Sequence, residues 1–418
     1  MDLNAEVSKL LYDILANPLI ILLFFWLILF LISQLFHVER WGVQISPFLL
    51  MFKTKRANRF IAKIARRYPR AWVAVWSLGA SVSLIVIVFV LYFLTSNLIK
   101  LFYRSPEASP LIPIVPGITI TGFTLIYIII PLFLVVLFHE FAHGVAAHVN
   151  NIPVRAAGLF LAIFFPGAFV EPDNRRLNES SGKAKLMVYA AGSFSNLGLA
   201  VIGLLLINST VFNIVISPLY SFPSGVIFQE TVSGSPISAY IVPPFILTGA
   251  SINGSSHIYP INSISDFLNF MDLTNPYTNV TLYTDKGVYT IPLDENPGNP
   301  GKGYLGVVLT TAFPYYPPKP WAEWLGPLLP YHLYQVFNWL WIISFSVGIF
   351  NLLPIPIFDG DKIVAVLLDR FISSEKTVQI RGRRLPIKKI LLYVIRVFSI
   401  LILALNILFS FIIFPVLF

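Results

Sequence analysis

The chain has 418 residues, of which 56% are hydrophobic and 12% charged; its mean hydropathy is +0.76 and its formal net charge +9. A water-soluble protein of this length exposes far more charge, so the composition excludes a soluble fold and indicates a polytopic membrane protein. The absence of cysteine excludes disulfides and thiolate metal ligands, so any zinc site must use histidine and carboxylate.

Six apolar stretches are long enough to cross a bilayer about 30 Å thick as helices. They cover residues 18–36, 72–98, 119–147, 186–207, 335–357 and 390–415. Before the first stretch, Asp2 and Glu6 stand where a signal peptide has basic residues, and the stretch itself is too long for a signal-peptide core. We therefore predict six transmembrane helices and no cleavable signal peptide.

The basic residues are concentrated in alternate connections between these spans. The first, third and fifth connections hold twenty-two Lys and Arg residues, whereas the opposite side holds six. By the positive-inside rule, the basic connections are expected to be cytoplasmic and both termini extracytoplasmic. This pattern explains the net charge without a nucleic-acid partner, and we expect none. Arg396 lies within the last span, from where its side chain can snorkel to the cytoplasmic interface.

The third span ends in the sequence HEFAH at residues 139–143. On a helix, His139 and His143 face one side, which suits two ligands of one zinc ion, with Glu140 beside the metal as general base. Chance matches to this pattern are easy to find in polar helices. Here chance is disfavoured, because ionisable side chains in an apolar helix are costly unless they are paired or bind a metal. The motif therefore predicts a zinc site at the cytoplasmic end of this span.

Residues 156–170 are apolar but too short and too rich in Gly and Pro for a spanning helix. Pro166-Gly167, between two β-prone runs, predicts the turn of a hairpin. Two placements remain open, a re-entrant hairpin beside the zinc site and an interfacial loop. A re-entrant hairpin could offer its edge strand to an extended substrate.

Residues 208–320 are richer in Ser, Asn, Thr, Gly and Pro, which predicts a small extracytoplasmic α+β domain. Strands are expected at 225–228, 250–254, 280–283 and 288–291. A helix is expected over 262–273, with Ser263 or Ser265 near its N-cap. The following stretch, 313–334, is rich in Tyr, Trp and Pro, as is typical of the outer headgroup region.

A catalytic zinc needs a third protein ligand and an open position. The candidates are His37, His148, His257, His332, Glu171, Asp173, Asp359 and Asp361. Asp359 stands out, because the run NLLPIPIFDG (351–360) ends the fifth span on the cytoplasmic side, at the depth of His139. The prolines break the helix and Gly360 lets the backbone turn, which could aim Asp359 inward. Taken alone, however, this run favours an Asp-Gly turn with an exposed carboxylate.

Together these motifs resemble the site-2 protease family of intramembrane zinc metalloproteases. The resemblance is carried by HEFAH (139–143), PGAFVEPD (166–173), GSFSN (192–196) and NLLPIPIFDG (351–360). It covers residues 119–210 and 335–365. Ser193 replaces the usual proline of the third motif and Phe358 the usual leucine before Asp359, but neither is a ligand position.

The resemblance implies one zinc ion, whose ligands would be His139, His143 and Asp359. Glu140 would be the base that activates the water at the metal. Asn196 and Asn351 would lie near the site, where they hold the substrate or stabilise the developing oxyanion; hydrogen bonding between helices is the alternative for each. The implied activity is hydrolysis of peptide bonds within transmembrane segments, so the expected partners are a membrane-protein substrate and the lipid bilayer. The sequence carries no signal for an oligomer.

The expected domain organisation has four parts. Residues 1–105 hold two accessory transmembrane helices and a basic loop, 106–210 and 321–418 form the catalytic core, and 211–320 form the extracytoplasmic domain. That domain resembles a PDZ domain in the sequences GVIF (225–228), GSP (234–236) and LTGASING (247–254). Ala250 stands where such domains often carry Asp, so peptide binding and a spacer role both remain open.

Three other interpretations compete with this one. A transporter that binds ions through the buried His and Glu would show repeated halves, and the sequence has no such repeat. An unrelated membrane zinc protease would take a Glu from a later helix as third ligand, which the Asp359 motif disfavours. A non-proteolytic scaffold would not need Glu140 together with a complete set of ligands.

Overall fold

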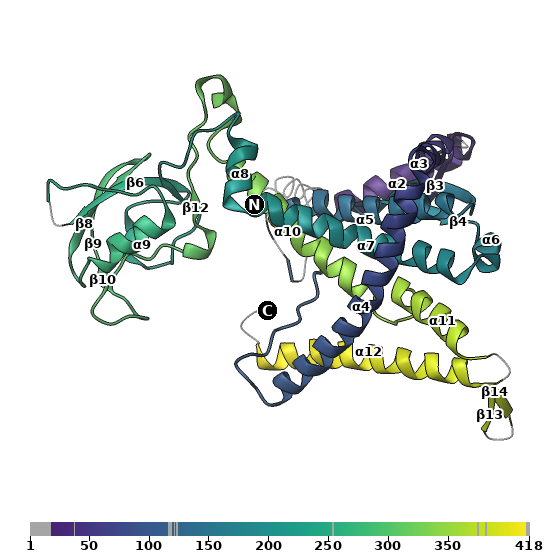
Figure 1. Cartoon of the computed structure of the whole chain (residues 1–418). Coiled ribbons are helices and arrows are strands. Elements are labelled where there is room, and N and C mark those ends of the chain that lie inside the picture. The colour runs from purple at the N-terminus through teal and green to yellow at the C-terminus, as the bar shows by residue number, and fades with distance from the viewer. Residues whose placement is uncertain are drawn as a thin grey trace, which may run out of the picture. The chain divides into compact units, whose positions relative to one another are not determined.

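The computed structural model describes residues 18–36, 38–115, 119–120, 122, 124–252, 255–373, 376–380 and 383–414. The chain forms two compact units (Figure 1): unit 1 comprises Met1–Leu204 and Val336–Phe418, and unit 2 comprises Leu205–Gln335. His37, the end of the strand predicted at 250–254 and the residues at both termini lie outside the described residues.

Within the described residues, five helices are long and apolar enough to cross a membrane. They are α4 (Pro69–Phe102), α5 (Thr124–Val149), α7 (Gly182–Ile207), α10 (Leu329–Phe350) and α12 (Ile387–Ile413). Four of them coincide with predicted spans to within five residues at each end, whereas α10 begins six residues before and ends seven residues before the span predicted at 335–357. The first predicted span is helix α2 (Pro18–Phe36), whose apolar stretch Ile20–Phe36 is shorter. The helices fit a polytopic membrane protein, and the sixth span stays a prediction.

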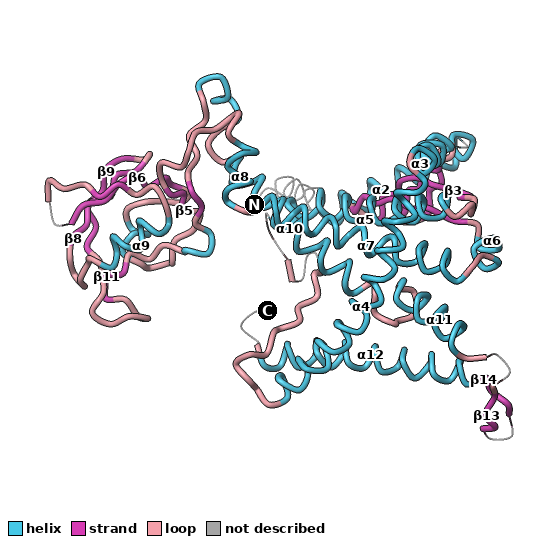
Figure 2. Tube along the Cα trace, in the orientation of Figure 1, coloured by secondary structure: helices cyan, strands magenta, loops and turns pink. Residues whose placement is uncertain are grey.

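Unit 1 also contains a four-stranded antiparallel sheet, visible in Figure 2 beside α5. Its strands, in spatial order, are β1 (Val43–Ser46), β2 (Leu49–Lys53), β3 (Val154–Ala162) and β4 (Phe165–Pro172). The hairpin predicted from residues 156–170 is therefore present as β3 and β4. Its partner, the hairpin β1–β2, lies in the basic connection, where no strand was predicted. β4 packs against α5 and forms one edge of the sheet.

The turn of the β3–β4 hairpin lies at Ile163-Phe164, so the prediction of a turn at Pro166-Gly167 was wrong. Pro166 pairs with Leu161 inside the ladder, and Ile163 takes the positive φ of 58°. Proline is tolerated because β4 is an edge strand, where its missing N–H faces away from β3. Gly167 is needed for packing, since a Cβ there would collide with the ring of Phe160.

Two shorter helices flank this sheet, and each begins at a side-chain cap. The Thr54 hydroxyl accepts the Arg56 N–H at the start of α3 (Lys55–Arg67), and the Asp173 carboxylate accepts the Arg176 N–H at the start of α6 (Asn174–Glu179). That N–H, together with the Arg155 side chain, holds the pKa of Asp173 below its ordinary value. Asp173 thus connects β3 to α6.

Buried polar groups join the helices of unit 1. Asn406 of α12 accepts a hydrogen bond from Asn97 of α4 at 2.9 Å and donates to the Leu94 carbonyl. Arg396 pairs with Asp361 through two hydrogen bonds of 2.6 and 2.7 Å, a partner that was not predicted, and its snorkelling to the interface stays a prediction. Asp361 belongs to α11 (Asp359–Phe371), so this pair fixes α11 against α12.

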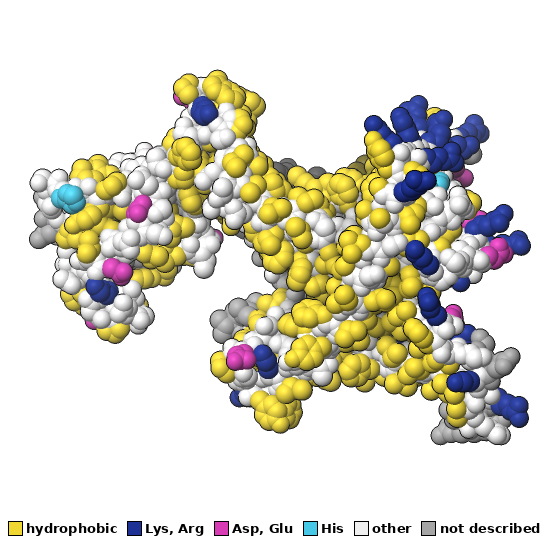
Figure 3. Space-filling view, viewed as in Figure 1, with side chains coloured by type: hydrophobic (Ala, Val, Ile, Leu, Met, Phe, Trp, Pro, Cys, Tyr) yellow, Lys and Arg dark blue, Asp and Glu magenta, His cyan; other side chains and the backbone are white. Residues whose placement is uncertain are grey.

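Most Lys and Arg side chains of unit 1 gather at the end that carries α3, α6 and the hairpin of β13 (Thr377–Ile380) and β14 (Arg383–Pro386) (Figures 1 and 3). The three basic connections therefore meet at one end of the helices. This is the distribution that the positive-inside rule requires of a single membrane face.

Unit 2 is an α+β fold built on one antiparallel sheet. Its path is β12 (Phe313–Pro314), β5 (Val226–Phe228), β6 (Phe245–Ile252), β8 (Asn279–Thr284) and β9 (Gly287–Pro292), with β7 (Tyr259–Pro260) paired to β6. Helix α8 (Ser209–Ile216) begins the unit, and β10 (Asp294–Glu295) pairs with β11 (Gly303–Tyr304). The four predicted strands are β5, β6, β8 and β9.

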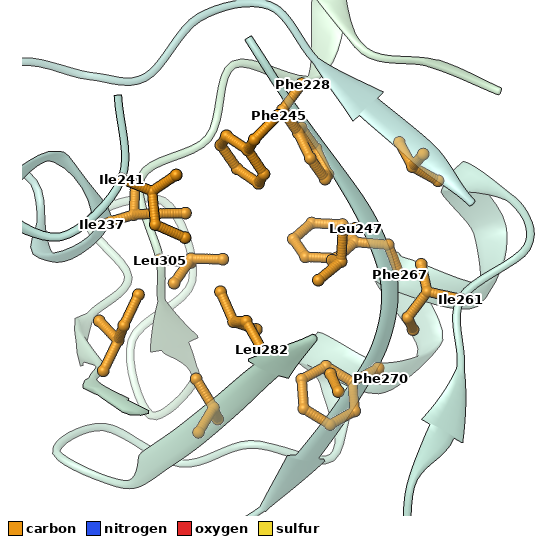
Figure 4. Packing of buried hydrophobic residues seen from close by; sticks show 14 of the residues in the cluster. Phe228, Ile237, Ile241, Phe245, Leu247, Ile261, Phe267, Phe270, Leu282 and Leu305 are labelled. Atoms are coloured by element: carbon orange, nitrogen blue, oxygen red, sulfur yellow. The ribbon is translucent and has the colours of Figure 1, made fainter. Parts of the chain in front are cut away.

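Helix α9 (Ile264–Asp272) covers the core of unit 2. Its N-cap is Ser263, whose hydroxyl accepts the Asp266 N–H, which confirms one of the two predicted caps. Figure 4 shows Phe267 and Phe270 of this helix facing Leu247 and Leu282 of the sheet. The unit therefore has a hydrophobic core of its own, and its likeness to a PDZ domain stays a prediction.

Candidate metal centre

The ligand atoms of three side chains converge at one point of unit 1. Nε2 of His139 and Nε2 of His143 lie 3.1 Å apart, and Oδ2 of Asp359 lies 3.3 Å from the first and 3.2 Å from the second. Among the described residues these three form a group able to hold a metal ion. Asp359 is only 4% exposed, and a carboxylate buried this deeply is costly unless a cation compensates it.

The spacing of these atoms fits zinc. Neighbouring ligands of a tetrahedral zinc with bonds of about 2.0–2.1 Å lie about 3.3 Å apart. The three observed separations, 3.1 to 3.3 Å, match that value. Three protein ligands of this type leave one coordination position free, as in catalytic rather than structural zinc sites.

The second ring nitrogen of each histidine has a partner that orients the imidazole. Nδ1 of His143 lies 2.6 Å from the Val188 carbonyl, so it carries the proton and leaves Nε2 for a metal. Nδ1 of His139 lies 3.0 Å from Nδ2 of Asn196, whose buried Oδ1 has no partner. Exchanging the amide oxygen and nitrogen of Asn196 lets Oδ1 accept the Nδ1 proton of His139, which leaves Nε2 of that ring for a metal.

Asp359 is positioned by the irregular segment between α10 and α11. Helix α10 ends at Phe350, before the prolines, and the chain turns at Ile357, whose φ is 84°. A β-branched residue with positive φ is strained, as is common at functional sites. Gly360 does not supply the turn, contrary to expectation. It lies in the first turn of α11, where its N–H donates a hydrogen bond to the Asn351 carbonyl at 2.9 Å. A Cβ at this position would collide with the carbonyl oxygen of Leu352.

Gly192 of α7 lets that helix approach the ligand histidines. Val188, Gly192 and Asn196 are spaced four residues apart, so they share one face of α7. A Cβ at Gly192 would lie 2.5 Å from Nε2 of both His139 and His143. Such a contact is far below van der Waals distance, so any side chain at this position must displace the ligand atoms.

Gly192→Ala is therefore expected to weaken zinc affinity by about 10- to 100-fold or more, the range seen when the support of ligands is lost. The measurement is the zinc dissociation constant of the purified protein, obtained by competition with a chelator. Gly198→Ala is the matched control, because a Cβ at Gly198 of the same helix meets nothing within 4 Å. Unchanged affinity in Gly192→Ala would contradict the site geometry.

Glu140 lies beside the ligands and contacts the hairpin. Its Oε2 accepts a hydrogen bond from the Val170 N–H of β4 at 2.9 Å. Val170 therefore turns its N–H away from β3, and by the two-residue period of a strand Ala168 does the same. The free edge of β4 thus runs from the turn towards Glu140.

A cavity of about 550 Å³ opens on the cluster. Its lining includes Glu140, Val170, Tyr189, Asn351 and Lys362, together with the ligands. Asn351 Nδ2 lies 3.1 Å from Oδ2 of Asp359, and Lys362 Nζ donates to Oδ1 of the same carboxylate at 3.1 Å. Tyr189 and Lys362 were not among the predicted site residues. The signal for Lys362 was its place three residues after Asp359 on a helix.

The other candidate ligands lie elsewhere. His148 Nε2 contacts Asn58 Oδ1 at 3.0 Å, Asp173 caps α6, and Asp361 pairs with Arg396. Glu171 is exposed on β4, and His257 packs against Tyr259 in unit 2. His332 lies in the first turn of α10, within unit 2. The structure therefore brings only Asp359 to the two histidines among the described candidates.

Comparison with known proteins places this arrangement in a family. The model of Peptidase family M50 matches residues 127–402. An uncharacterised protein of Methanocaldococcus jannaschii is 23% identical over 364 residues, which are 86% of this chain and 85% of that protein. A membrane-bound transcription factor site-2 protease homolog of Arabidopsis thaliana is 25% identical over 223 residues, 51% of this chain. The chain covers 42% of the length of that plant protein.

Apolar helices that carry a His-His-Asp cluster, together with these matches, define a membrane metallopeptidase. The family match extends over well more than half of the chain and includes every residue of the cluster. The chain belongs to Peptidase family M50, the site-2 protease family. The resemblance that the sequence motifs indicated is thereby confirmed.

Proposed function

We propose that this protein is a zinc-dependent intramembrane endopeptidase that cleaves peptide bonds within the transmembrane segments of other membrane proteins. The observation that carries the proposal is the convergence of His139, His143 and Asp359 on one point, beside Glu140 and open to a cavity. A structural metal site would be closed by a fourth protein ligand.

The residues of the site have distinct roles in this proposal. His139, His143 and Asp359 hold one zinc ion, which when bound supplies Lewis acidity to the scissile carbonyl and lowers the pKa of water to about 7. Glu140 takes the proton from the attacking water and returns it to the leaving amine. Its Oε2 is fixed by the Val170 N–H, so the carboxylate stays at the edge of the cavity.

The two asparagines differ in their surroundings. Asn196 contacts the outer nitrogen of His139, which supports a role in orienting that ligand rather than in contacting substrate. Asn351 Nδ2 lies 3.2 Å from Nε2 of His139 and faces the cavity. From there it can donate a hydrogen bond to the oxyanion that develops on the substrate carbonyl.

The substrate segment must be extended at the scissile bond, because helical hydrogen bonds and packing shield its carbonyl. We propose that the free edge of β4 holds it, through the outward N–H and carbonyl of Ala168 and the outward carbonyl of Val170, whose own N–H is bonded to Glu140. An apolar cavity of about 580 Å³, lined by side chains of α5, α10 and α12 and by Phe165 next to the hairpin turn, supplies room for apolar substrate side chains.

Ala168→Pro tests the edge strand. Proline removes an outward N–H of β4 without removing a ladder bond to β3, as Pro166 already shows at the neighbouring outward position. The expected result is at least a 10-fold loss of cleavage with zinc content unchanged. Ala168→Ser, which keeps the N–H, should cleave at the rate of the wild type. Full activity of Ala168→Pro would rule out pairing through this group.

The orientation of the metal centre in the membrane is inferred from the positions of the Lys and Arg residues. Most basic side chains of unit 1 meet at one end (Figure 3), and HEFAH occupies the end of α5 that leads into the basic connection 150–185. We propose that this end is cytoplasmic, that water reaches the site from there, and that unit 2 and both termini are extracytoplasmic.

The test of the proposed function combines metal content with cleavage. The full-length protein, purified in detergent, should contain one zinc ion per chain and cut a model transmembrane peptide. Chelation should stop cleavage, and stoichiometric zinc should restore it. Asp359→Ala should lose both zinc and cleavage, whereas Asp369→Ala, on the same helix and paired with Lys388 at its surface, should keep both. A wild type without zinc and without cleavage would contradict the proposal and favour a transporter or scaffold.

A further inference from the structure

Unit 1 contains another cavity, separate from the metal centre, that is lined by basic side chains. It measures about 740 Å³ and lies between the 3-10 helix Val38–Trp41, the end of β2, the start of α3 and the start of β3. Its charged lining residues are Arg40, Lys53, Lys55, Arg59, Arg155 and one carboxylate, Glu39. None of them lines the cavity of the metal cluster.

Most of these cations lack a counter-charge. Arg155 pairs with Asp173 at 3.0 Å. Across the described part of the chain, no ion pair involves Arg40, Lys53, Lys55 or Arg59. Helix α3 also has no acidic residue in its first turn and begins with Lys55-Arg56. Positive side chains at a helix N-terminus are unfavourable, because they add to the positive end of the helix dipole.

We propose that this cavity binds the phosphate group of an anionic phospholipid. Arg and Lys side chains beside a helix N-terminus are a favourable environment for phosphate. The rim indicates that the phosphate belongs to a lipid. Trp41 lines the cavity, is 70% exposed and follows the apolar helix α2, and tryptophan in such a position is typical of the headgroup region.

The position of the cavity connects such a ligand to the catalytic sheet. The Thr54 N–H donates to the Ala157 carbonyl at 3.0 Å, so the cavity wall is the junction of β2 and α3 with β3. β3 pairs with β4, which contacts Glu140. A headgroup in the cavity therefore holds the N-terminal hairpin and α3 against the strand next to the metal centre. Binding itself does not depend on the proposed peptidase activity.

The experiment titrates the full-length protein in neutral detergent with three probes at constant ionic strength: short-chain phosphatidylglycerol, short-chain phosphatidylcholine and inorganic phosphate. The readout is the melting temperature, from which a dissociation constant follows. Phosphatidylglycerol is expected to raise the melting temperature to a plateau as its concentration increases. Phosphatidylcholine is expected to leave the melting temperature unchanged.

Two triple variants separate the cavity from the general positive charge. Arg40→Gln/Lys53→Gln/Arg59→Gln removes three cavity cations and should weaken phosphatidylglycerol binding by roughly 100-fold, about 5-fold for each cation. Arg66→Gln/Arg67→Gln/Arg70→Gln removes three cations that do not line the cavity and should keep the wild-type affinity.

Each outcome bears on the proposal. Equal weakening in both variants, or no saturable stabilisation of the wild type by phosphatidylglycerol or phosphate, would overturn it. Inorganic phosphate could stabilise the protein as strongly as phosphatidylglycerol does, with the effect lost only in the cavity variant. The cavity would then be a phosphate site, but its ligand would be a soluble phosphate and the lipid proposal would be overturned. If the cavity variant does not fold, the charge-retaining Arg40→Lys/Lys53→Arg/Arg59→Lys should still bind phosphatidylglycerol, and failure to do so would contradict the proposal.

Discussion

Glu140→Gln is expected to lower peptide cleavage by about 10²- to 10⁴-fold while zinc stays bound, because it removes the proposed general base without touching a proposed ligand. The glutamine amide cannot accept a proton from water. Its oxygen can still accept the hydrogen bond that the Val170 N–H donates to Glu140 Oε2 at 2.9 Å, so β4 should keep its place against α5. The measurement is the initial rate of cleavage of a model transmembrane peptide, with zinc content determined on the same sample.

Glu179→Gln is the matched control for this variant. Glu179 lies on the exposed helix α6 and pairs with Arg175 at 3.0 Å, so the change removes one negative charge away from the metal centre. It should leave both cleavage and zinc unchanged. Cleavage by Glu140→Gln at the wild-type rate would show that Glu140 is not the base. Loss of zinc together with cleavage would instead make Glu140 part of the metal site.

The central part of the site could be predicted from the sequence because its signals are local. The four-residue spacing of His139 and His143 on one helix defines their geometry, and the apolar context makes a chance match costly. Asp359 lies more than two hundred residues further along the chain. The run that contains it favoured an exposed turn when taken alone, and the resemblance to a family singled Asp359 out as a ligand.

Other features could not be predicted because they depend on contacts between distant segments. Residues 43–46 alternate apolar and polar side chains, as a strand does, but their sheet is completed by residues 154–172. The basic residues around β1 and β2 pointed to a connection between spans. Likewise, Ile357 holds a positive φ that sequence assigns to glycine. The surrounding structure imposes this conformation, so no local pattern reveals it.

The ion pair between Arg396 and Asp361 also could not be predicted from the sequence. Breaking this pair is the substitution for which we expect the largest loss of stability. Arg396→Met leaves the Asp361 carboxylate, 7% exposed, without its partner in an apolar region. Removing one member of a fully buried pair costs about 3–5 kcal/mol, and because the Arg396 side chain is 33% exposed we expect about 2–3 kcal/mol here. Because Asp361 lies two residues after Asp359 on α11, zinc affinity should fall as well. The measurements are the free energy of unfolding in detergent and the zinc dissociation constant.

A second ion pair between the same two helices provides the control. Lys388 Nζ of α12 lies 2.6 Å from Asp369 Oδ1 of α11, but the Asp369 side chain is 61% exposed. Lys388→Met should therefore cost less than about 1 kcal/mol and leave zinc affinity unchanged. The double variant Arg396→Met/Asp361→Leu removes both charges of the pair and should recover most of the stability lost in Arg396→Met. If the double variant is as unstable as Arg396→Met, the lost free energy of unfolding comes from the packing of the arginine side chain. The unpaired charge of Asp361 would then not be the cause of the destabilisation.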